Sequence, residues 1–409
     1  MRRYWHPIAA SAELRDQPTK LVRILGESLV LYRDRSGRAG LIQDYCPHRG
    51  TSLLYGIPED DGLRCPYHGW KFDGNGRCID MPAEPKGHLL RERVHVVNYP
   101  VEELGGLIFA YLGPSPAPLL PRWNILTMDN LVKEEKVYKE IGTIEVPCNW
   151  LQIMENSVDT THREFLHYNF SNYVFERLGD PPIPVQRRQI EVGYEESRYG
   201  IVKRDLLEGG SYEDESWTVG QTLVFPNMIA TGSRKAPVLQ IRVPVDDTTT
   251  RQYFYSCYIL PPDISVPTEG DVPHFDIPMP APGKIEWPLF ISNVIQDVAI
   301  LASQGPVYDR SRERLGDSDQ GVNIYRKMLA REISAVENGE DPTSIFRDPE
   351  EARGPVLPFG KSRGGGGPRL SRYGPLSNVQ MFSPLISHLR QQGVDFERVF
   401  GRDLIVDKK

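Results

Sequence analysis

The chain has 409 residues, of which 39% are hydrophobic and 25% charged, and its net charge is −7. This length allows two domains with a substantial core, and the acidic balance argues against nucleic-acid binding, which needs a basic patch. No apolar run reaches membrane-spanning length, Met1–Ala10 is not a signal peptide, and five cysteines are too few for a disulfide scaffold. We therefore expect a cytoplasmic protein without a membrane or nucleic-acid partner.

The first 120 residues predict a small antiparallel β domain. Residues 21–46 alternate apolar and polar side chains around turn signals, and 70–79 predict a hairpin with the tip Asp-Gly-Asn-Gly. Residues 94–113 predict two more strands. The prolines between Pro114 and Pro121 indicate a connection, so we place the domain boundary near residue 120.

Residues 121–409 predict a second domain of strands and helices. The helical segments are 150–168, 288–309 (broken near Gly305) and the amphipathic 319–340. Strands are predicted at 188–206, 216–230, 237–245 and 251–260, Pro/Gly-rich loops at 261–286, and a flexible loop at Gly364–Gly367.

Two short cysteine–histidine motifs dominate the first domain. They read Cys46-Pro-His48 and Cys65-Pro-Tyr-His68, with sixteen residues between His48 and Cys65. Thiolates suit an Fe–S cluster, and imidazole suits iron or zinc. Two Cys and two His form the ligand set of a Rieske [2Fe–2S] centre, in which histidines bind one of the two irons.

A Cys₂His₂ zinc site is the alternative for these four residues. Its usual order is two cysteines followed by two histidines, whereas here each cysteine precedes its own histidine. This alternating order favours the Rieske centre. The remaining cysteines, Cys78, Cys148 and Cys257, are expected to be ordinary buried thiols.

A second group of candidate metal ligands lies on the helical segment 150–168. His162 and His167 are five residues apart, so on a regular helix they point about 140° away from each other. Both can face one metal only if the helix ends, bends or contains a π-bulge there, and such bulges favour functional sites. For a lone helical histidine the ordinary interpretation is a surface or core residue.

A third ligand at this site should be a carboxylate. Two histidines and one carboxylate form the facial triad of non-haem Fe(II) oxygenases, which leaves positions open for O₂ and substrate. Asp297 is the candidate, on the predicted helix 288–309, although an aspartate at such a position is normally solvated.

The motifs together resemble the Rieske non-haem iron ring-hydroxylating oxygenases. CPHRG and CPYHGW are similar to their cluster motif, and Asp159-x₂-His162-x₄-His167 with a distant Asp297 resembles their catalytic pattern. The resemblance covers Trp5–Trp70, Asn149–His167 and Asp297–Leu329. The α-subunits of the phthalate and phenoxybenzoate dioxygenase group look most similar, notably over QGPVYDRSRERLGDSDQGV.

The resemblance implies an α+β fold. It consists of an all-β Rieske domain (1–120) and a catalytic domain (121–409) with a large antiparallel sheet flanked by helices. It also implies a [2Fe–2S] cluster, a mononuclear Fe(II), and electrons from NADH through a flavin- and ferredoxin-type reductase. Asp159 would link His68 of one chain to His162 of its neighbour in a homotrimer or hexamer.

The implied activity is O₂-dependent oxidation of an aromatic small molecule. Cis-dihydroxylation of an aromatic carboxylate or aryl ether is the leading interpretation; monooxygenation or O- or N-demethylation, and an electron-transfer role without catalysis, are alternatives. The substrate pocket is expected between the helix 150–168 and the sheet. Basic residues that could bind a substrate carboxylate are Arg204, Arg234, Lys235 and Arg242. Trp217, Phe225, Phe254 and Tyr258 are expected in the core rather than in a pocket wall.

Overall fold

A computed structural model describes most of the chain as two compact units. The described residues are 1–128, 135–182, 188–268, 270, 272–281, 283–360, 370–371, 374–375 and 378–400. Unit 1 contains Met1–Pro121, Pro244–Asp246 and Ile345–Ala352, and unit 2 contains Arg122–Val243, Asp247–Ser344 and Arg353–Lys409. The predicted loop at Gly364–Gly367 lies outside the described residues. No helix within the described ranges is long and apolar enough to cross a membrane.

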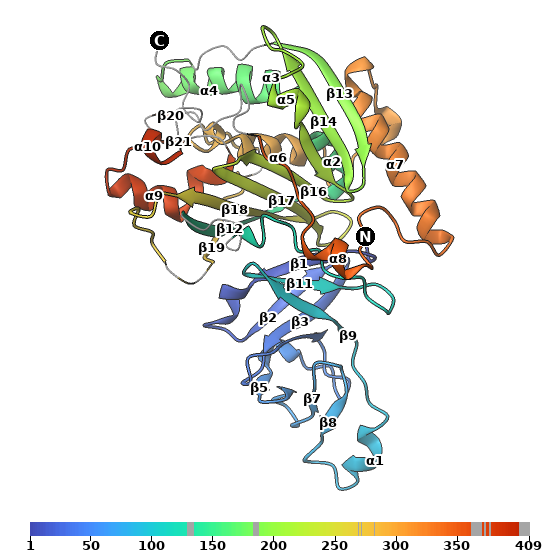
Figure 1. The fold of residues 1–409 in the computed structure, drawn as a ribbon. Coiled ribbons are helices and arrows are strands. Elements are labelled where there is room, and N and C mark those ends of the chain that lie inside the picture. The colour runs from blue at the N-terminus through green and yellow to red at the C-terminus, as the bar shows by residue number, and fades with distance from the viewer. Residues whose placement is uncertain are drawn as a thin grey trace. The chain divides into compact units, whose positions relative to one another are not determined.

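Unit 1 is built from three small antiparallel sheets (Figure 1). The first has the order β1-β11-β10, from Trp5–Ala10, Leu107–Tyr111 and Val101–Leu104. The second has the order β2-β3-β4-β9, from Thr19–Ile24, Glu27–Arg33, Ala39–Gln43 and Asn98–Tyr99. The third has the order β5-β6-β7-β8, from Ile57–Glu59, Gly62–Arg64, Lys71–Phe72 and Cys78–Asp80. Short helices are η1 (Ser11–Leu14), η2 (Leu53–Tyr55), α1 (Gly87–Arg91) and, almost wholly in this unit, α8 (Pro349–Arg353).

Unit 2 is organised around an eight-stranded sheet (Figure 1). Its order is β13-β14-β15-β16-β17-β18-β12-β19. Strand β19 is parallel to β12, and the pairs β12/β18, β13/β14, β14/β15, β15/β16 and β16/β17 are antiparallel. The strands are Gln189–Ser197, Gly200–Leu207, Gln221–Val224, Met228–Ser233, Ala236–Pro244, Thr250–Leu260, Lys136–Val146 and His274–Asp276, in that order. A two-stranded ribbon pairs β20 (Leu370–Ser371) with β21 (Gly374–Pro375).

Helices cover one face of this sheet. Those that matter for the site are α2 (Trp150–Val158), α3 (His162–Glu164), the π-helix η4 (Phe165–Phe170), α4 (Ser171–Leu178), α6 (Asn293–Ser303) and α7 (Gln320–Glu337). The others are α5 (Glu215–Thr218), η5 (Leu289–Ile291), η6 (Arg310–Arg312), η7 (Asp317–Asp319), η8 (Asn378–Phe382), α9 (Pro384–Gln391) and α10 (Phe396–Phe400). The expected α+β architecture is confirmed.

The main core of unit 2 lies between the sheet and these helices. Val238 and Phe254, on neighbouring central strands, pack in one apolar cluster with Val294, Ile295 and Val298 of α6. Since side chains alternate along a strand, the residues at 240 and 242 share the face of Val238. This face of the sheet therefore looks toward the helix that carries Asp297.

Four local predictions were wrong in detail. The segment 188–206 is two strands, because the chain turns before Gly200, whose positive φ of 145° and close approach to the Leu223 carbonyl require glycine. The segment 216–230 begins with the short helix α5 and then contains β15 and β16. The Pro/Gly-rich region hides the short strand β19, and residues 94–113 form three strands rather than two.

Candidate metal centres

The two cysteine–histidine loops of unit 1 have the same backbone design. In the first loop Gly50 donates its amide to the Cys46 carbonyl at 2.9 Å, and in the second Gly69 donates to the Cys65 carbonyl at 3.1 Å. Both glycines have positive φ, 72° and 78°, which glycine adopts without strain. Each loop therefore forms a tight turn that begins at its cysteine.

The side chains of these loops converge. Cys46 and Cys65 are 1% and 2% exposed, and their thiols are close enough to interact. The His48 and His68 rings lie 4.4 Å apart between centroids, and Trp70 stacks on His48 at 4.5 Å. The sequence motifs did not predict that Trp70 packs against His48.

The chemistry of this cluster fits a Rieske centre. Burial, together with the neighbouring Cys65 thiol, raises the pKa of the Cys46 thiol to about 11, so a bound metal must stabilise the thiolate. His48 Nδ1 is buried and has no hydrogen-bond partner among the described residues, as expected of an atom that ligates a metal. The Cys78 thiol is nearby but points to the Asp80 carbonyl at 3.6 Å, and Cys148 and Cys257 are also buried free thiols, as predicted.

In unit 2 the helical segment that was expected over 150–168 is irregular. Asn149 caps the N-terminus of α2, where its side chain accepts the Leu151 amide at 3.0 Å, and Asp159 follows the last helical residue with extended backbone angles. Helix α3 follows and continues into η4, a π-helix. An i→i+5 hydrogen-bond pattern brings residues five positions apart toward one face, so of the three possibilities, an end, a bend or a π-bulge, the structure has the π-helix. The break at Asp159 lies before both histidines and was not predicted, because 150–168 was expected to be one helix.

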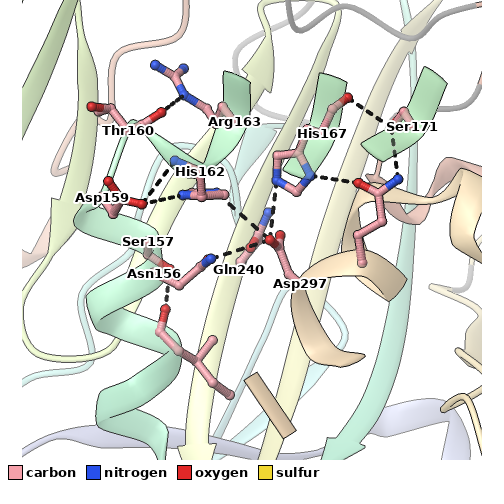
Figure 2. Close-up of polar contacts among 12 residues, drawn as sticks. Asn156, Ser157, Asp159, Thr160, His162, Arg163, His167, Ser171, Gln240 and Asp297 are labelled. Carbon is pink, nitrogen blue, oxygen red and sulfur yellow. Dashed lines mark hydrogen bonds and ion pairs between the residues drawn. The ribbon is translucent and has the colours of Figure 1, made fainter. Parts of the chain in front are cut away.

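His162 of α3 and His167 of the π-helix come together with Asp297 (Figure 2). One ligand atom from each residue lies within 4.8 Å of the other two. Asp297 Oδ1 is 3.2 Å from His167 Nε2 and 3.8 Å from His162 Nε2. The three side chains thus present two imidazole nitrogens and one carboxylate to a common point.

The opposite nitrogen of each ring has its own partner (Figure 2). His162 Nδ1 lies 2.9 Å from Asp159 Oδ2, and His167 Nδ1 lies 3.0 Å from Gln296 Oε1. These contacts leave both Nε2 atoms facing Asp297, the arrangement that metal-binding histidines usually have.

The charges of the site suit a divalent cation. Burial alone would raise the pKa of Asp159, but His162 holds it at about 2. Burial likewise opposes ionisation of Asp297, while His167 and His162 keep its pKa below the usual value. Two ionised carboxylates therefore accompany two imidazoles.

A groove of about 500 Å³ opens beside the site. Helices α2, η4, α6 and α7 supply its wall, and the lining includes Asp159, His162, Phe165, Ile300 and Val322. It lies among helices, so it is distinct from the helix–sheet pocket that we predict for the substrate. Phe165 is 57% exposed despite its apolar ring.

Of the four basic residues considered for substrate binding, three have ordinary partners. Arg204 binds Glu195, Arg234 binds Glu215 and Lys235 binds Glu135. Arg242 differs, because it is buried on β17 on the face that looks toward α6. Phe225, Phe254 and Tyr258 are buried core residues as expected, and Trp217 is half-buried.

Comparison with known proteins identifies the family. The Rieske [2Fe-2S] domain profile matches residues 4–100. The chain is 37% identical to the 5,5'-dehydrodivanillate O-demethylase oxygenase subunit of a Sphingobium species, covering 88% of this chain and 81% of the relative. This chain belongs to the Rieske non-haem iron oxygenases. The recognition made from the motifs is thereby confirmed.

Two further relatives are named as dioxygenase subunits. This oxygenase is 34% identical to the phenoxybenzoate dioxygenase subunit alpha of Ectopseudomonas oleovorans (86% of this chain, 85% of the relative). It is 31% identical to the phthalate 4,5-dioxygenase oxygenase subunit of Pseudomonas putida (83% of each). The solved structure of the Pseudomonas putida CBB5 NdmA QL mutant with theobromine shares the fold, with a TM-score of 0.57 and 20% identity over 83% of this chain and 92% of that chain.

Proposed function

We propose that this oxygenase holds a [2Fe–2S] cluster through Cys46, Cys65, His48 and His68, with the cysteines on one iron and the histidines on the other. We further propose that His162, His167 and Asp297 hold a mononuclear Fe(II). A ferrous ion there supplies open positions and electrons for O₂ chemistry beside a bound substrate. The observation that carries this assignment is the convergence of the three ligand atoms within 4.8 Å.

The chain's own residues orient the ligands. Asp159 accepts the His162 Nδ1 proton and two backbone amides, from Thr161 at 2.8 Å and His162 at 3.1 Å, so its carboxylate is fixed. Asn156 Nδ2 donates to Asp297 Oδ1 at 3.4 Å. Lys203 Nζ donates to the Ser157 carbonyl at 2.6 Å and thereby stabilises the free carbonyl end of α2.

For the substrate we propose an aromatic carboxylate, on the evidence of Arg242. Its side chain donates to Gln240 O at 3.2 Å and to Gln240 Oε1 at 2.6 Å, but its Nε has no partner among the described residues. It also forms no ion pair with a carboxylate in those residues. Burial lowers the pKa of Arg242, although the Asp297 carboxylate favours the charged guanidinium electrostatically. A buried guanidinium without a contacting carboxylate is costly, so an anionic group of the substrate would complete the site.

Cis-dihydroxylation of such an acid is the first candidate reaction. O-demethylation is the second, and the identity to the dehydrodivanillate O-demethylase subunit favours it. The test is oxygen uptake with NADH, a phthalate-type reductase and a panel of aromatic acids and methoxylated acids, with product analysis. Oxygen consumption without an oxidised product from any acid would contradict the proposal.

The proposed partners are a flavin- and ferredoxin-type reductase and further copies of this chain in a homotrimer or hexamer. Asp159 would there lie between His68 of one chain and His162 of its neighbour. The support is that Asp159 borders a groove whose apolar rim includes the exposed Phe165 and Ile300. Light scattering on the purified holoprotein measures the assembly, and an active monomer would contradict it. We expect the complex in the cytoplasm.

A further inference from the structure

A closed set of hydrogen bonds fixes the second histidine of the iron site. Gln296 Nε2 donates to Ser171 Oγ at 2.8 Å and to the Phe290 carbonyl at 2.7 Å, and Gln296 Oε1 faces His167 Nδ1 at 3.0 Å. Ser171 Oγ in turn donates to the His167 carbonyl at 2.9 Å. Figure 2 shows Ser171, a member of this set, on the side of His167 away from Asp297.

The circuit determines which proton sits where. The Phe290 carbonyl can only accept, so the Gln296 atom facing it must be the NH₂ group. The Gln296 carbonyl therefore faces His167 and can only accept from it. Neutral His167 must then carry its proton on Nδ1, which leaves the Nε2 lone pair directed toward Asp297.

Gln296 also makes the two histidines electrically different. The partner of His162 is the carboxylate of Asp159, whereas the partner of His167 is an uncharged amide. With two neutral imidazoles, the two carboxylates Asp159 and Asp297 balance a divalent ion. A third carboxylate at position 296, where the side chain is fully buried, would add an excess negative charge.

We infer that Gln296 is a positioning residue of the iron site, which selects the Nε2-ligating tautomer of His167 and keeps the outer partner of that histidine uncharged. This rests on the proposed iron site. Sequence reasoning missed Gln296, since a glutamine beside an aspartate on an apolar helix has no distinctive pattern.

The test uses three variants loaded with Co(II), whose visible spectrum reports ligand geometry. Gln296→Leu removes the acceptor, and we expect Co(II) affinity to fall about 10- to 100-fold with an altered spectrum. Gln296→Glu keeps an acceptor for His167 but loses the NH₂ donor and adds charge, and we expect Co(II) to bind with near-normal affinity. In the same variant loaded with iron, we expect a lower reduction potential of the mononuclear iron. Gln380→Leu, at a buried glutamine of η8, is the matched control and should change neither property.

The outcomes separate this inference from the proposed function. If the wild-type protein does not bind Co(II), or if His162→Ala does not abolish that binding, the proposed iron site itself fails. If wild type binds Co(II) and Gln296→Leu, with an intact Rieske spectrum, binds it with equal affinity and spectrum, the inference about Gln296 is overturned. Should Gln296→Leu not fold, an unchanged iron potential in Gln296→Glu overturns it instead.

Discussion

The two candidate metal centres are encoded over very different lengths of chain. The four proposed cluster ligands lie within residues 46–68, on two loops with matching backbone hydrogen bonds. The three proposed iron ligands span residues 162–297 and meet only because α6 packs against the broken helix in the core of unit 2. A local motif therefore specifies the first centre, whereas correct folding of the whole of unit 2 is required for the second.

The largest effect should come from removing one iron ligand. His162→Ala deletes an imidazole that faces Asp297, so substrate turnover should fall to background while the Rieske absorption spectrum stays intact. Oxygen uptake and visible absorption measure the two properties on one sample. Full turnover by this variant would contradict the proposal that His162 belongs to a separate iron centre that turnover requires.

Asp159→Asn tests whether the two centres communicate through this residue. The substitution keeps the shape but removes the charge and one of the two acceptor oxygens. The direct ligands of both centres are unchanged, so both metals should remain. We expect cluster-to-iron electron transfer to slow about 10- to 100-fold, the usual cost of losing an outer partner. Single-turnover spectroscopy with substrate and O₂ measures it, and cluster re-oxidation at the wild-type rate would refute the bridge.

Arg242→Met tests whether unit 2 binds an acidic substrate. Loss of a charge-assisted hydrogen bond should lower kcat/KM about 10- to 100-fold, mainly through KM. The free energy of unfolding should hold or rise, because a buried charge that has no contacting carboxylate among the described residues disappears. Arg204→Met, at a residue paired with Glu195, is the control; equal effects of both variants on KM would count against the carboxylate site.

The last prediction concerns stability rather than turnover and involves Glu140, a buried carboxyl on β12 of unit 2 that is not among the proposed ligands of either centre. Burial raises its pKa to about 7 although Ser383 and Tyr258 donate hydrogen bonds to it. A folded pKa above the unfolded value of 4.5 means that this contribution to stability is present below pH 4.5 and is lost as pH rises through 7. The loss is on the order of 3 kcal/mol.

Glu140→Gln should remove that part of the pH dependence. Urea unfolding at pH 5 and pH 8, followed by a probe in unit 2, measures it, with Glu103→Gln in unit 1 as control. The same pH dependence in wild type and Glu140→Gln would show that this carboxyl does not titrate between those values.

The same contrast explains what could be predicted from the sequence. The strand pairs of unit 1 and the helix α7 follow from local alternation and amphipathicity, and the spacing of His162 and His167 indicated irregular helix between them, where the π-helix lies. Asp297 needed the family resemblance. Gln296 and the burial of Arg242 were not predictable, because each depends on which face of a distant element it meets.

We propose that one chain holds two different iron centres. Iron and acid-labile sulfide analysis of the purified holoprotein tests it most directly. We expect three irons and two sulfides per chain, and two irons with two sulfides in His162→Ala, since only the mononuclear ion depends on that ligand. One zinc without labile sulfide, or an iron content unchanged by His162→Ala, would contradict the claim.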